Sequence, residues 1–539
     1  MSASSKKKLR NAEQAEKMTE KQLAEQKEAK KLKLYTTLAV VILIALVVFA
    51  AYIGISRAVV NSGIRERNTV ALTIGDQKIS NAEFNYYYID AVNDFYSQFG
   101  NYASVLGLDL TKPLNEQIVD EDTQKTWADD FIQSATDNVC ATYALVAEAK
   151  ANGFTLPEDS VTTIDNAIAT MSMYATIYGY PNTNSYIKAM YGNGADEKSL
   201  REYYEMTELA RTYQLDYQES LTYTDDQLRA AEAENFNKFS SYNYNYYYLT
   251  VNSFLETNVE EATAEQKAAA VQAAEEAAKS LTDGITTVEA FDAAIAALSI
   301  NADKTSVASY ASEDTSFSNL NTAYADWMAD PARKTGNMTY VPYIATSTDE
   351  NGNEIEQING YYVVMFGSCN DNTYPLANVR HILVKPEGGT YNSNTGMFDY
   401  TEEEKAAARA EAEAILNEWK SGDATEESFA ALANEKSDDG DGTTGGLYED
   451  VYPGQMVAAF EDWCFDNRKA GDTGIVETEY GCHVMFYSGD SETSYRDHLI
   501  SGELAANDFN TWYAAIVDAV TPTGHDFKYI KTDLVLGAA

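Results

Sequence analysis

The residues of this chain that could do chemistry are few. It has four histidines, which are His381, His483, His498 and His525. None of them lies in an HExxH zinc motif, and the sequence has neither a GxSxG nucleophile elbow nor a GxxxxGKS phosphate loop. The four cysteines form no CxxC pair. Metal, serine-hydrolase and phosphate-loop chemistry therefore lack their residues, and we expect neither a metal nor a cofactor.

A more specific set of segments surrounds two of the histidines. In chain order they are RHILVK around His381, LANEKSDDG ending near Asp439, GGLYEDVYPGQMVAAFED, and TEYGCHVMF around His483. In these segments and their order the chain resembles the parvulin-type peptidyl-prolyl cis-trans isomerases. The resemblance covers residues 374–490. With the helical flanks it extends more loosely to the extracytoplasmic foldases of the PrsA and SurA type.

The resemblance implies a site and a role for each of its residues. His381 and His483 would lie on adjacent strands and form paired imidazoles at the floor of the site, with Thr478 completing the hydrogen-bonded chain. Asp439 falls where the family carries Cys or Asp, and its carboxylate would polarise the surroundings of the amide. The catalytic set implied is His381, Asp439, His483 and Thr478, and the substrate-binding set is Met456, Phe460, Gln455 and Leu447.

Plainer interpretations of the same residues stay open at this point. Met456 and Phe460, which would line the proline slot, could be ordinary core residues, and the two histidines could mainly hold the shape of the site. Asp438 could replace Asp439 if the register shifts by one residue. Gln455 could cap a turn rather than bind the substrate backbone.

The chain departs from the family pattern at the start of the third segment. The Gly-Gly-Asp-Leu-Gly of the family is replaced by GGLYE at 445–449, which moves an acid and adds a ring at the edge of the slot. We expect turnover to suffer from this change. The loop at 386–400 has no Arg or Lys, so a preference for phosphorylated Ser-Pro is not expected.

These elements follow a membrane-spanning segment in the sequence. Residues 34–56 are 23 positions without a charge, enough for a helix to cross a bilayer at about 1.5 Å per residue. The preceding arm, residues 1–33, has ten Lys/Arg and five Asp/Glu, which predicts a cytoplasmic N-terminus and extracytoplasmic C-terminal domains. A cleaved signal peptide is the alternative, although the arm and the apolar run are long for one.

The remaining chain predicts an α+β multidomain protein. We expect a mostly helical, chaperone-like module at 70–240, and a helix and strand at 491–539 that pack back on it. Between them, segments 241–369 and 374–490 repeat one order of strands and helices, including a tryptophan segment at Trp327 and at Trp463. We interpret them as two tandem parvulin-like domains.

The first of these two domains is expected to be catalytically silent. The positions that match the two histidines are assigned to Tyr247 and Tyr362, and no equivalent of the GG or GQM element is found. A silent copy could bind extended, aromatic-rich peptides or act as a spacer, and the sequence does not decide between these roles.

The function predicted is that of a peptidyl-prolyl isomerase and chaperone for exported, unfolded polypeptides with X-Pro bonds. It would be anchored in the cell membrane by one helix. The alternative is a holdase chaperone whose parvulin fold has little activity. A wall-associated adhesin or scaffold is a third class, which leaves the histidines and GQM unexplained. The net charge of −44 would repel nucleic acid, so no such partner is expected.

Overall fold

The computed structural model describes residues 3–16, 20–234, 236–257, 259, 261–348, 354–393, 395–440 and 442–538. Residues 1–2 and 17–19 of the predicted basic arm therefore lie outside the described part. The chain divides into two compact units. The first consists of Met1–Leu221 with Asp508–Ala539, and the second is Thr222–Asn507.

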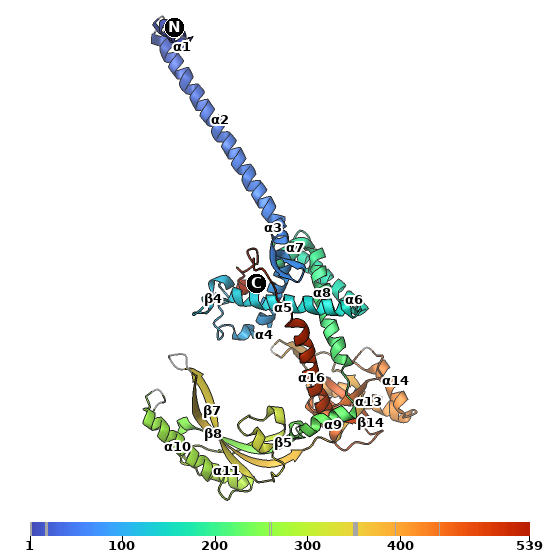
Figure 1. Ribbon diagram of the computed structural model, residues 1–539. Coiled ribbons are helices and arrows are strands. Elements are labelled where there is room, and N and C mark those ends of the chain that lie inside the picture. The colour runs from blue at the N-terminus through green and yellow to red at the C-terminus, as the bar shows by residue number, and fades with distance from the viewer. Residues whose placement is uncertain are drawn as a thin grey trace. The chain divides into compact units, whose positions relative to one another are not determined.

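The predicted membrane segment lies in one long helix. After α1 (Ala3–Glu16), helix α2 (Glu20–Asn61) runs for 42 residues and contains the whole apolar stretch (Figure 1, blue). Its side chains point outward, and Leu43 and Phe49 are 64% and 61% exposed. A core helix of a soluble domain would bury such residues. Among the described residues, α2 alone is long and apolar enough to cross a membrane.

The rest of the first unit is mostly helical. A β-hairpin leads into a core built around α4, where Ser80 caps the helix by accepting a hydrogen bond from the Glu83 N–H at 3.2 Å. Buried aromatic and aliphatic side chains of α4, α5 and α8 form this core. The elements are α3 (Ile64–Asn68), β1 (Val70–Ile74), β2 (Gln77–Ser80), α4 (Asn81–Phe99), β3 (Ile118–Asp120), β4 (Lys125–Thr126), α5 (Trp127–Ala151), α6 (Glu158–Ile177), α7 (Thr183–Tyr191) and α8 (Glu197–Ser220).

The C-terminal segment packs on this helical core. Helix α16 (Tyr495–Val517) begins in the second unit, and in the first unit its Trp512 ring stacks on Tyr217 with centroids 4.0 Å apart. The tail beyond it is irregular, apart from one bridge between Thr73 and Thr523, where we expected a strand. Beyond its contacts with β1 at Thr523 and Asp526, backbone groups of the tail pair with the side chains of Asn81 and Asn85.

The second unit contains two four-stranded antiparallel sheets with the same topology. Their strand orders are β6-β5-β8-β7 and β12-β9-β14-β13. Helix α9 (Asp225–Glu234) precedes them. The first sheet and its helices are β5 (Ser241–Thr250), α10 (Ala264–Ser280), α11 (Val288–Ala296), β6 (Tyr310–Ser316), α12 (Ala325–Met328), β7 (Met338–Thr348) and β8 (Glu354–Asn370). The second comprises β9 (Pro375–Val384), β10 (Thr390–Asn392), β11 (Met397–Asp399), α13 (Glu402–Ser421), α14 (Glu426–Lys436), β12 (Leu447–Val451), α15 (Ala458–Phe465), β13 (Thr473–Thr478) and β14 (Gly481–Ser494).

The tryptophan segments show how closely the two repeats correspond. The Arg333 guanidinium lies 4.3 Å from the Trp327 ring centroid, and Arg468 lies 4.7 Å from that of Trp463. Each arginine also donates from Nε to the carbonyl of its tryptophan, at 2.8 and 2.9 Å. This shared arrangement aligns α12 with α15 residue by residue.

Candidate functional site

The two histidines are positioned by the central strands of the second sheet. In the antiparallel register His381 of β9 lies opposite Met485, and His483 of β14 lies opposite Leu383. The two are therefore diagonal neighbours on the same face of the sheet. They are buried, with 3% and 6% of their surface exposed, and their ring centroids are 5.2 Å apart.

Hydrogen bonds join the two rings to groups on either side. The Nδ1 atoms of His381 and His483 are 3.0 Å apart. Nε2 of His381 lies 3.0 Å from a carboxylate oxygen of Asp439, and Nε2 of His483 lies 2.8 Å from Oγ1 of Thr478. The Tyr448 hydroxyl donates to the same carboxylate oxygen at 3.0 Å. A continuous chain therefore runs from Thr478 to Tyr448.

One set of tautomers satisfies the whole chain. An ionised Asp439 only accepts, so His381 carries its proton on Nε2 and its Nδ1 accepts. His483 must then donate from Nδ1 and accept on Nε2 from the Thr478 hydroxyl. That hydroxyl also accepts from the Tyr480 N–H at 3.1 Å. All four ring nitrogens are used, so neither imidazole keeps a proton for a substrate.

The electrostatics agree with two neutral rings beside an ionised acid. Burial lowers the pKa of His381 against the opposing effect of Asp439. Burial and the neighbouring His381 lower the pKa of His483 to about 4. Burial works to raise the pKa of Asp439, but the hydrogen bond from Tyr448 and the interaction with His381 outweigh it and hold this pKa below its usual value. At neutral pH the site carries one negative charge, on Asp439.

The loop after α14 brings Asp439, and not Asp438, to the histidines. The Ser437 hydroxyl accepts from the Leu383 N–H at 3.1 Å, and the Asp438 N–H donates to the Leu383 carbonyl at 2.8 Å. The Asp438 carboxylate faces away and accepts from the Lys385 N–H at 2.8 Å. The loop thus follows the end of β9 and leaves Asp439 beside His381.

The glycine pair lets β12 lie against β9 at the site. Gly445 and Gly446 both have φ of +65°, a left-handed conformation that suits glycine. A Cβ on Gly446 would lie 2.1 Å from the His381 carbonyl oxygen. The close approach places Tyr448 at the rim of the site, with its ring centroid 5.2 Å from that of His381.

A cavity of about 440 Å³ opens above the histidines. The Phe460 ring stands nearly perpendicular to both imidazoles, with centroids 5.4 Å from each. Met456 and Val457 are partly buried beside it, because the turn before α15 holds them against the core under β9 and β14. The cavity is lined by His381, Leu383, Lys385, Asp439, Tyr448, Gln455, Met456, Val457, Phe460, Tyr480 and His483.

The expected substrate-binding residues do not all line the cavity. Met456 and Phe460 line the cavity and also belong to the core, so both interpretations describe them. Gln455 lines the cavity and caps a turn, since its Oε1 accepts from the Tyr452 N–H at 3.1 Å, which leaves its NH2 group for a substrate. Leu447 pairs with Arg380 on the strands and does not line the cavity. Its neighbour Tyr448 does, because successive strand residues face opposite sides.

The cavity contains further residues that were not in the expected set. Leu383 lies two positions after His381 and so faces the same side of β9, which strand alternation indicates in advance. Tyr480 is 50% exposed at the rim, in the turn between β13 and β14. Lys385 adds a positive charge to the lining and lies two positions after Leu383, so the same alternation indicates it.

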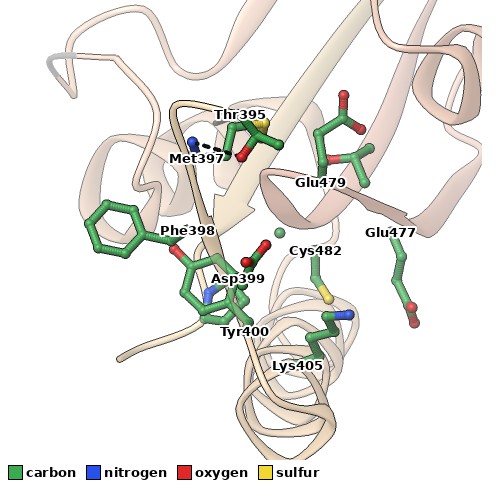
Figure 2. A pocket seen from close by; sticks show the side chains of 12 residues that line it. Thr395, Met397, Phe398, Asp399, Tyr400, Lys405, Glu477, Glu479 and Cys482 are labelled. Atoms are coloured by element: carbon green, nitrogen blue, oxygen red, sulfur yellow. Dashed lines mark hydrogen bonds between the residues drawn. The ribbon is translucent and has the colours of Figure 1, made fainter. Parts of the chain in front are cut away.

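A second cavity, of about 490 Å³, lies beyond the β13–β14 turn. Figure 2 shows its lining, with Asp399 and Tyr400 from the β10–β11 side and Glu479 and Cys482 from the turn and β14. It contains no histidine. Of the hydrogen-bonded chain, only Thr478 lines the second cavity, whereas Asp439 and both histidines line the first, which is the candidate active site.

The strand register of the first sheet shows that one of the two residues expected to match the histidines is wrong. Val364 of β8 lies opposite Tyr246 of β5, as Met485 lies opposite His381, and both Val364 and Met485 are core residues beneath the short helix. Tyr362 therefore matches His483, as expected, but Tyr246 and not Tyr247 matches His381. Tyr247 packs in the core under α10 on the opposite face, because a shift of one residue along a strand changes the face.

Comparisons with known proteins were made at the level of families and of solved structures. Residues 381–488 match the PPIC-type PPIASE domain family, and residues 27–215 match the SurA-like N-terminal domain family. No curated protein matches the chain. The chain thus carries a PPIC-type peptidyl-prolyl isomerase domain behind a SurA-like N-terminal domain.

Several solved structures are similar to parts of the chain. Peptidylprolyl isomerase PrsA from Bacillus cereus is 24% identical over 28% of this chain and 50% of its own, with a TM-score of 0.18. Foldase protein PrsA from Lactococcus lactis is 16% identical over 69% and 100%, with a TM-score of 0.14. The SurA-like chaperones of Campylobacter jejuni are 12% identical over 56% and 82%, with a TM-score of 0.14. The chain spans half the length of the B. cereus protein that it matches.

Proposed function

We propose that this chain catalyses cis-trans isomerisation of X-Pro bonds in its second repeat and assists the folding of exported polypeptides. The observation that carries the proposal is the cavity whose floor is the hydrogen-bonded pair His381 and His483, with the ionised Asp439 at its edge. The PPIC-type match of residues 381–488 supports the same activity.

The reaction requires no bond to be made or broken. A peptide bond resists rotation with a barrier of about 18–20 kcal/mol, and X-Pro isomerisation takes tens to hundreds of seconds. An enzyme lowers this barrier by binding the twisted amide more tightly than either planar form. Met456, Val457 and Phe460 offer an apolar slot that would hold the pyrrolidine ring while the preceding carbonyl rotates.

Asp439 is the candidate catalytic residue of this cavity. A planar amide places negative charge on its carbonyl oxygen, and twisting removes much of that charge. A carboxylate near the oxygen therefore destabilises the planar forms more than the twisted one. Because the pKa of Asp439 is held below its usual value, the carboxylate is charged at neutral pH and can act in this way.

The two histidines act as positioning residues in this proposal. Both nitrogens of each ring are occupied, so their role is to hold Asp439 in place and to form a rigid, uncharged floor. Thr478 fixes the tautomer of His483 at the far end of the chain. This division favours a structural role for the imidazoles over direct proton transfer to the substrate.

The location we propose is the outer face of the cytoplasmic membrane. Helix α2 would span the bilayer, with the basic arm in the cytoplasm and the chain that follows α2 outside. Clients would be newly exported, unfolded chains, and the SurA-like N-terminal region would bind them. Labelling of a cysteine placed in the arm of a Cys369→Ser variant, which lacks the exposed native thiol, with a membrane-impermeant maleimide tests the orientation, since a cytoplasmic arm stays unlabelled in intact cells.

The activity is tested with the full-length protein in detergent micelles and a short, uncharged X-Pro peptide, by NMR exchange between the isomers. We expect catalysis by the wild type and a large loss in Met456→Ala, whose side chain lines the slot. The matched control is Met397→Ala, a methionine that lines only the second cavity. A wild-type rate equal to the uncatalysed rate would refute the activity.

One observation favours a second candidate, a holdase with little isomerase activity. Tyr448 is the ring that the departure from the family pattern adds at the edge of the slot. Its hydroxyl donates to the same carboxylate oxygen of Asp439 that Nε2 of His381 contacts. Tyr448→Gly distinguishes the candidates. A rise in isomerase rate shows that the ring limits an otherwise competent site, whereas suppression of client aggregation without catalysis in both proteins identifies a holdase.

A further inference from the structure

One face of the first sheet is covered by seven tyrosines. They come from all four strands and from the segment just before α12, and we call them the tyrosine face. They are Tyr244, Tyr246 and Tyr248 of β5, Tyr310 of β6, Tyr324, Tyr343 of β7 and Tyr362 of β8. The opposite face packs against α10 and α11 and forms a separate core.

The rings of the tyrosine face form one continuous surface. Tyr362 is at its centre, with ring centroids 4.8 Å from Tyr248, 5.6 Å from Tyr324 and 5.9 Å from Tyr343. Tyr246 joins it at 6.2 Å and extends the surface to Tyr310 at 5.6 Å. Such contacts hold the rings in place before any ligand arrives.

This surface occupies the place that the isomerase cavity occupies in the second repeat. By strand register, Tyr246 and Tyr362 stand where His381 and His483 stand. Tyr324 lies three residues before Trp327, as Phe460 lies three before Trp463, and its ring stands at 71° to that of Tyr362. The first repeat therefore has an aromatic ring at each position that matches His381, His483 or Phe460 in the second.

Exposure and charge limit what the surface can bind. Tyr310 is 62% exposed and Tyr343 is 38% exposed. Between them, Tyr246, Tyr248 and Tyr362 are partly buried, and Tyr244 and Tyr324 are buried. Neither central strand has a charged residue in this region, from Tyr242 to Thr250 on β5 or from Gly360 to Ser368 on β8. Burial raises the pKa of Tyr324 and of Tyr362, so their phenols stay neutral. The chain as a whole has a net charge of −44, but this face is uncharged and therefore suits an uncharged ligand.

We propose that the tyrosine face is a second client-binding site, which holds uncharged, proline-containing segments of an unfolded chain without isomerising them. The proposal rests on the proposed function, because it takes the prolyl ring as the ligand of the equivalent cavity. Proline segments adopt the extended polyproline conformation at little entropic cost and dock on aromatic surfaces. The tyrosine hydroxyls at the rim can donate to their exposed carbonyl groups.

Catalysis is absent from this site for a definite reason. The two central strands that carry the tyrosine face contribute no charged residue to it, from Tyr242 to Thr250 or from Gly360 to Ser368. The Tyr324 and Tyr244 hydroxyls instead pair with each other at 3.2 Å. A bound X-Pro unit therefore meets rings on which it can pack, but no charge that would favour the twisted amide.

The test uses the full-length protein with the second site disabled by Met456→Ala. The probe is a fluorescein-labelled, uncharged proline-rich peptide, and the comparison peptide has every proline replaced by alanine. We expect Tyr310→Ser/Tyr343→Ser to weaken binding of the proline peptide about tenfold, as truncating two aromatic contacts does at interfaces. Tyr391→Ser is the matched control, because Tyr391 is 58% exposed in the other repeat, outside both sites. It should leave binding unchanged.

A second measurement does not depend on weakened variants. Benzoylphenylalanine placed at position 343 should cross-link the proline peptide, and the same group at position 391 should not. Equal binding of the alanine peptide, or binding that the double variant leaves unchanged, overturns the proposal. The wild-type isomerase rate on the short X-Pro peptide reports separately on the proposed function. The proposed binding site and the proposed isomerase activity can therefore be refuted independently of each other.

Discussion

The two repeats of the second unit have the same sheet, the same tryptophan–arginine contact and the same ring positions, yet one can carry chemistry and the other cannot. In the second repeat, two imidazoles connect a buried floor to Asp439. In the first, tyrosines fill the equivalent places on β5 and β8. The difference teaches that two repeats can share the positions of their rings without sharing the charged, hydrogen-bonded chain.

The charge of the second repeat depends on two local features of its chain. In the second repeat, the segment after α14 follows the end of β9 and presents Asp439, and the left-handed pair Gly445-Gly446 lets β12 approach His381. We interpret the first repeat as a binding surface and the second as a catalytic one. The predictions below test where this comparison holds and where it fails.

The largest effect is expected from truncating the ring above each floor. Phe460 and Tyr324 are 3% and 4% exposed, so replacing either by alanine should lower the free energy of unfolding of its repeat by about 3–5 kcal/mol. Hydrogen exchange of the sheet amides measures both losses. Only Phe460→Ala should also abolish isomerisation, and equal losses of rate in both variants would contradict the assignment of catalysis to the second repeat.

The next effect is a dependence of stability on pH that the second repeat has and the first lacks. The pKa of His483 is about 4 in the native state, against about 6.5 for an unperturbed imidazole. Between these values the unfolded chain binds a proton that the native chain does not. The free energy of unfolding therefore falls as pH falls through this window, by at most about 3 kcal/mol, and is fully restored above it.

Hydrogen exchange at a series of pH values measures this slope for each sheet. His483→Gln should reduce it in the second repeat without changing the first, and His381, whose pKa is also lowered by burial, accounts for a remaining slope. A slope that this variant leaves unchanged would show that other groups cause it.

A smaller effect, on rate, is expected from the acid. Asp439→Asn keeps the size of the side chain but removes its charge, and should lower kcat/KM about 30- to 100-fold, as the loss of one electrostatic contact to a transition state does. Asp438→Asn is the control, since that carboxylate faces the Lys385 N–H. If the two variants lose rate equally, the charge of Asp439 has no special role.

The smallest effect tests the common architecture itself. Arg333→Ala and Arg468→Ala each remove a stacking contact and a hydrogen bond to a tryptophan carbonyl. Each should cost its own repeat about 1–2 kcal/mol. Thermal unfolding followed by tryptophan fluorescence measures the two losses, and a marked inequality would weaken the equivalence of the repeats.

Much of the fold could be predicted from the sequence, because its signals are local. The uncharged run from Leu34 to Ser56 defines a helix, and alternating strands with similar helices define two repeats. The strand expected in the C-terminal tail did not form, since Asn81 and Asn85 bind its backbone through their side chains. Such pairing joins residues more than four hundred positions apart, which no local pattern records.

Most of the expected residues line the site or join its hydrogen-bonded chain, but Leu447 does not, and the connections between the residues could not be predicted. The resemblance brought His381, His483, Asp439 and Thr478 together, and the structure places them in one hydrogen-bonded chain. The direction of that chain depends on which nitrogen carries each proton, which only the geometry of all partners determines. The assignment of Tyr247 instead of Tyr246 came from counting along an aromatic run without knowing the strand register.

The central claim is that two neutral, oriented imidazoles hold an ionised Asp439 in the prolyl cavity. Histidine-selective ¹⁵N NMR of the full-length protein at neutral pH tests it most directly, with resonances assigned by His381→Gln and His483→Gln. The account predicts two neutral rings, with the proton of His381 on Nε2 and that of His483 on Nδ1. An imidazolium at either position, or the reverse pair of tautomers, would contradict it.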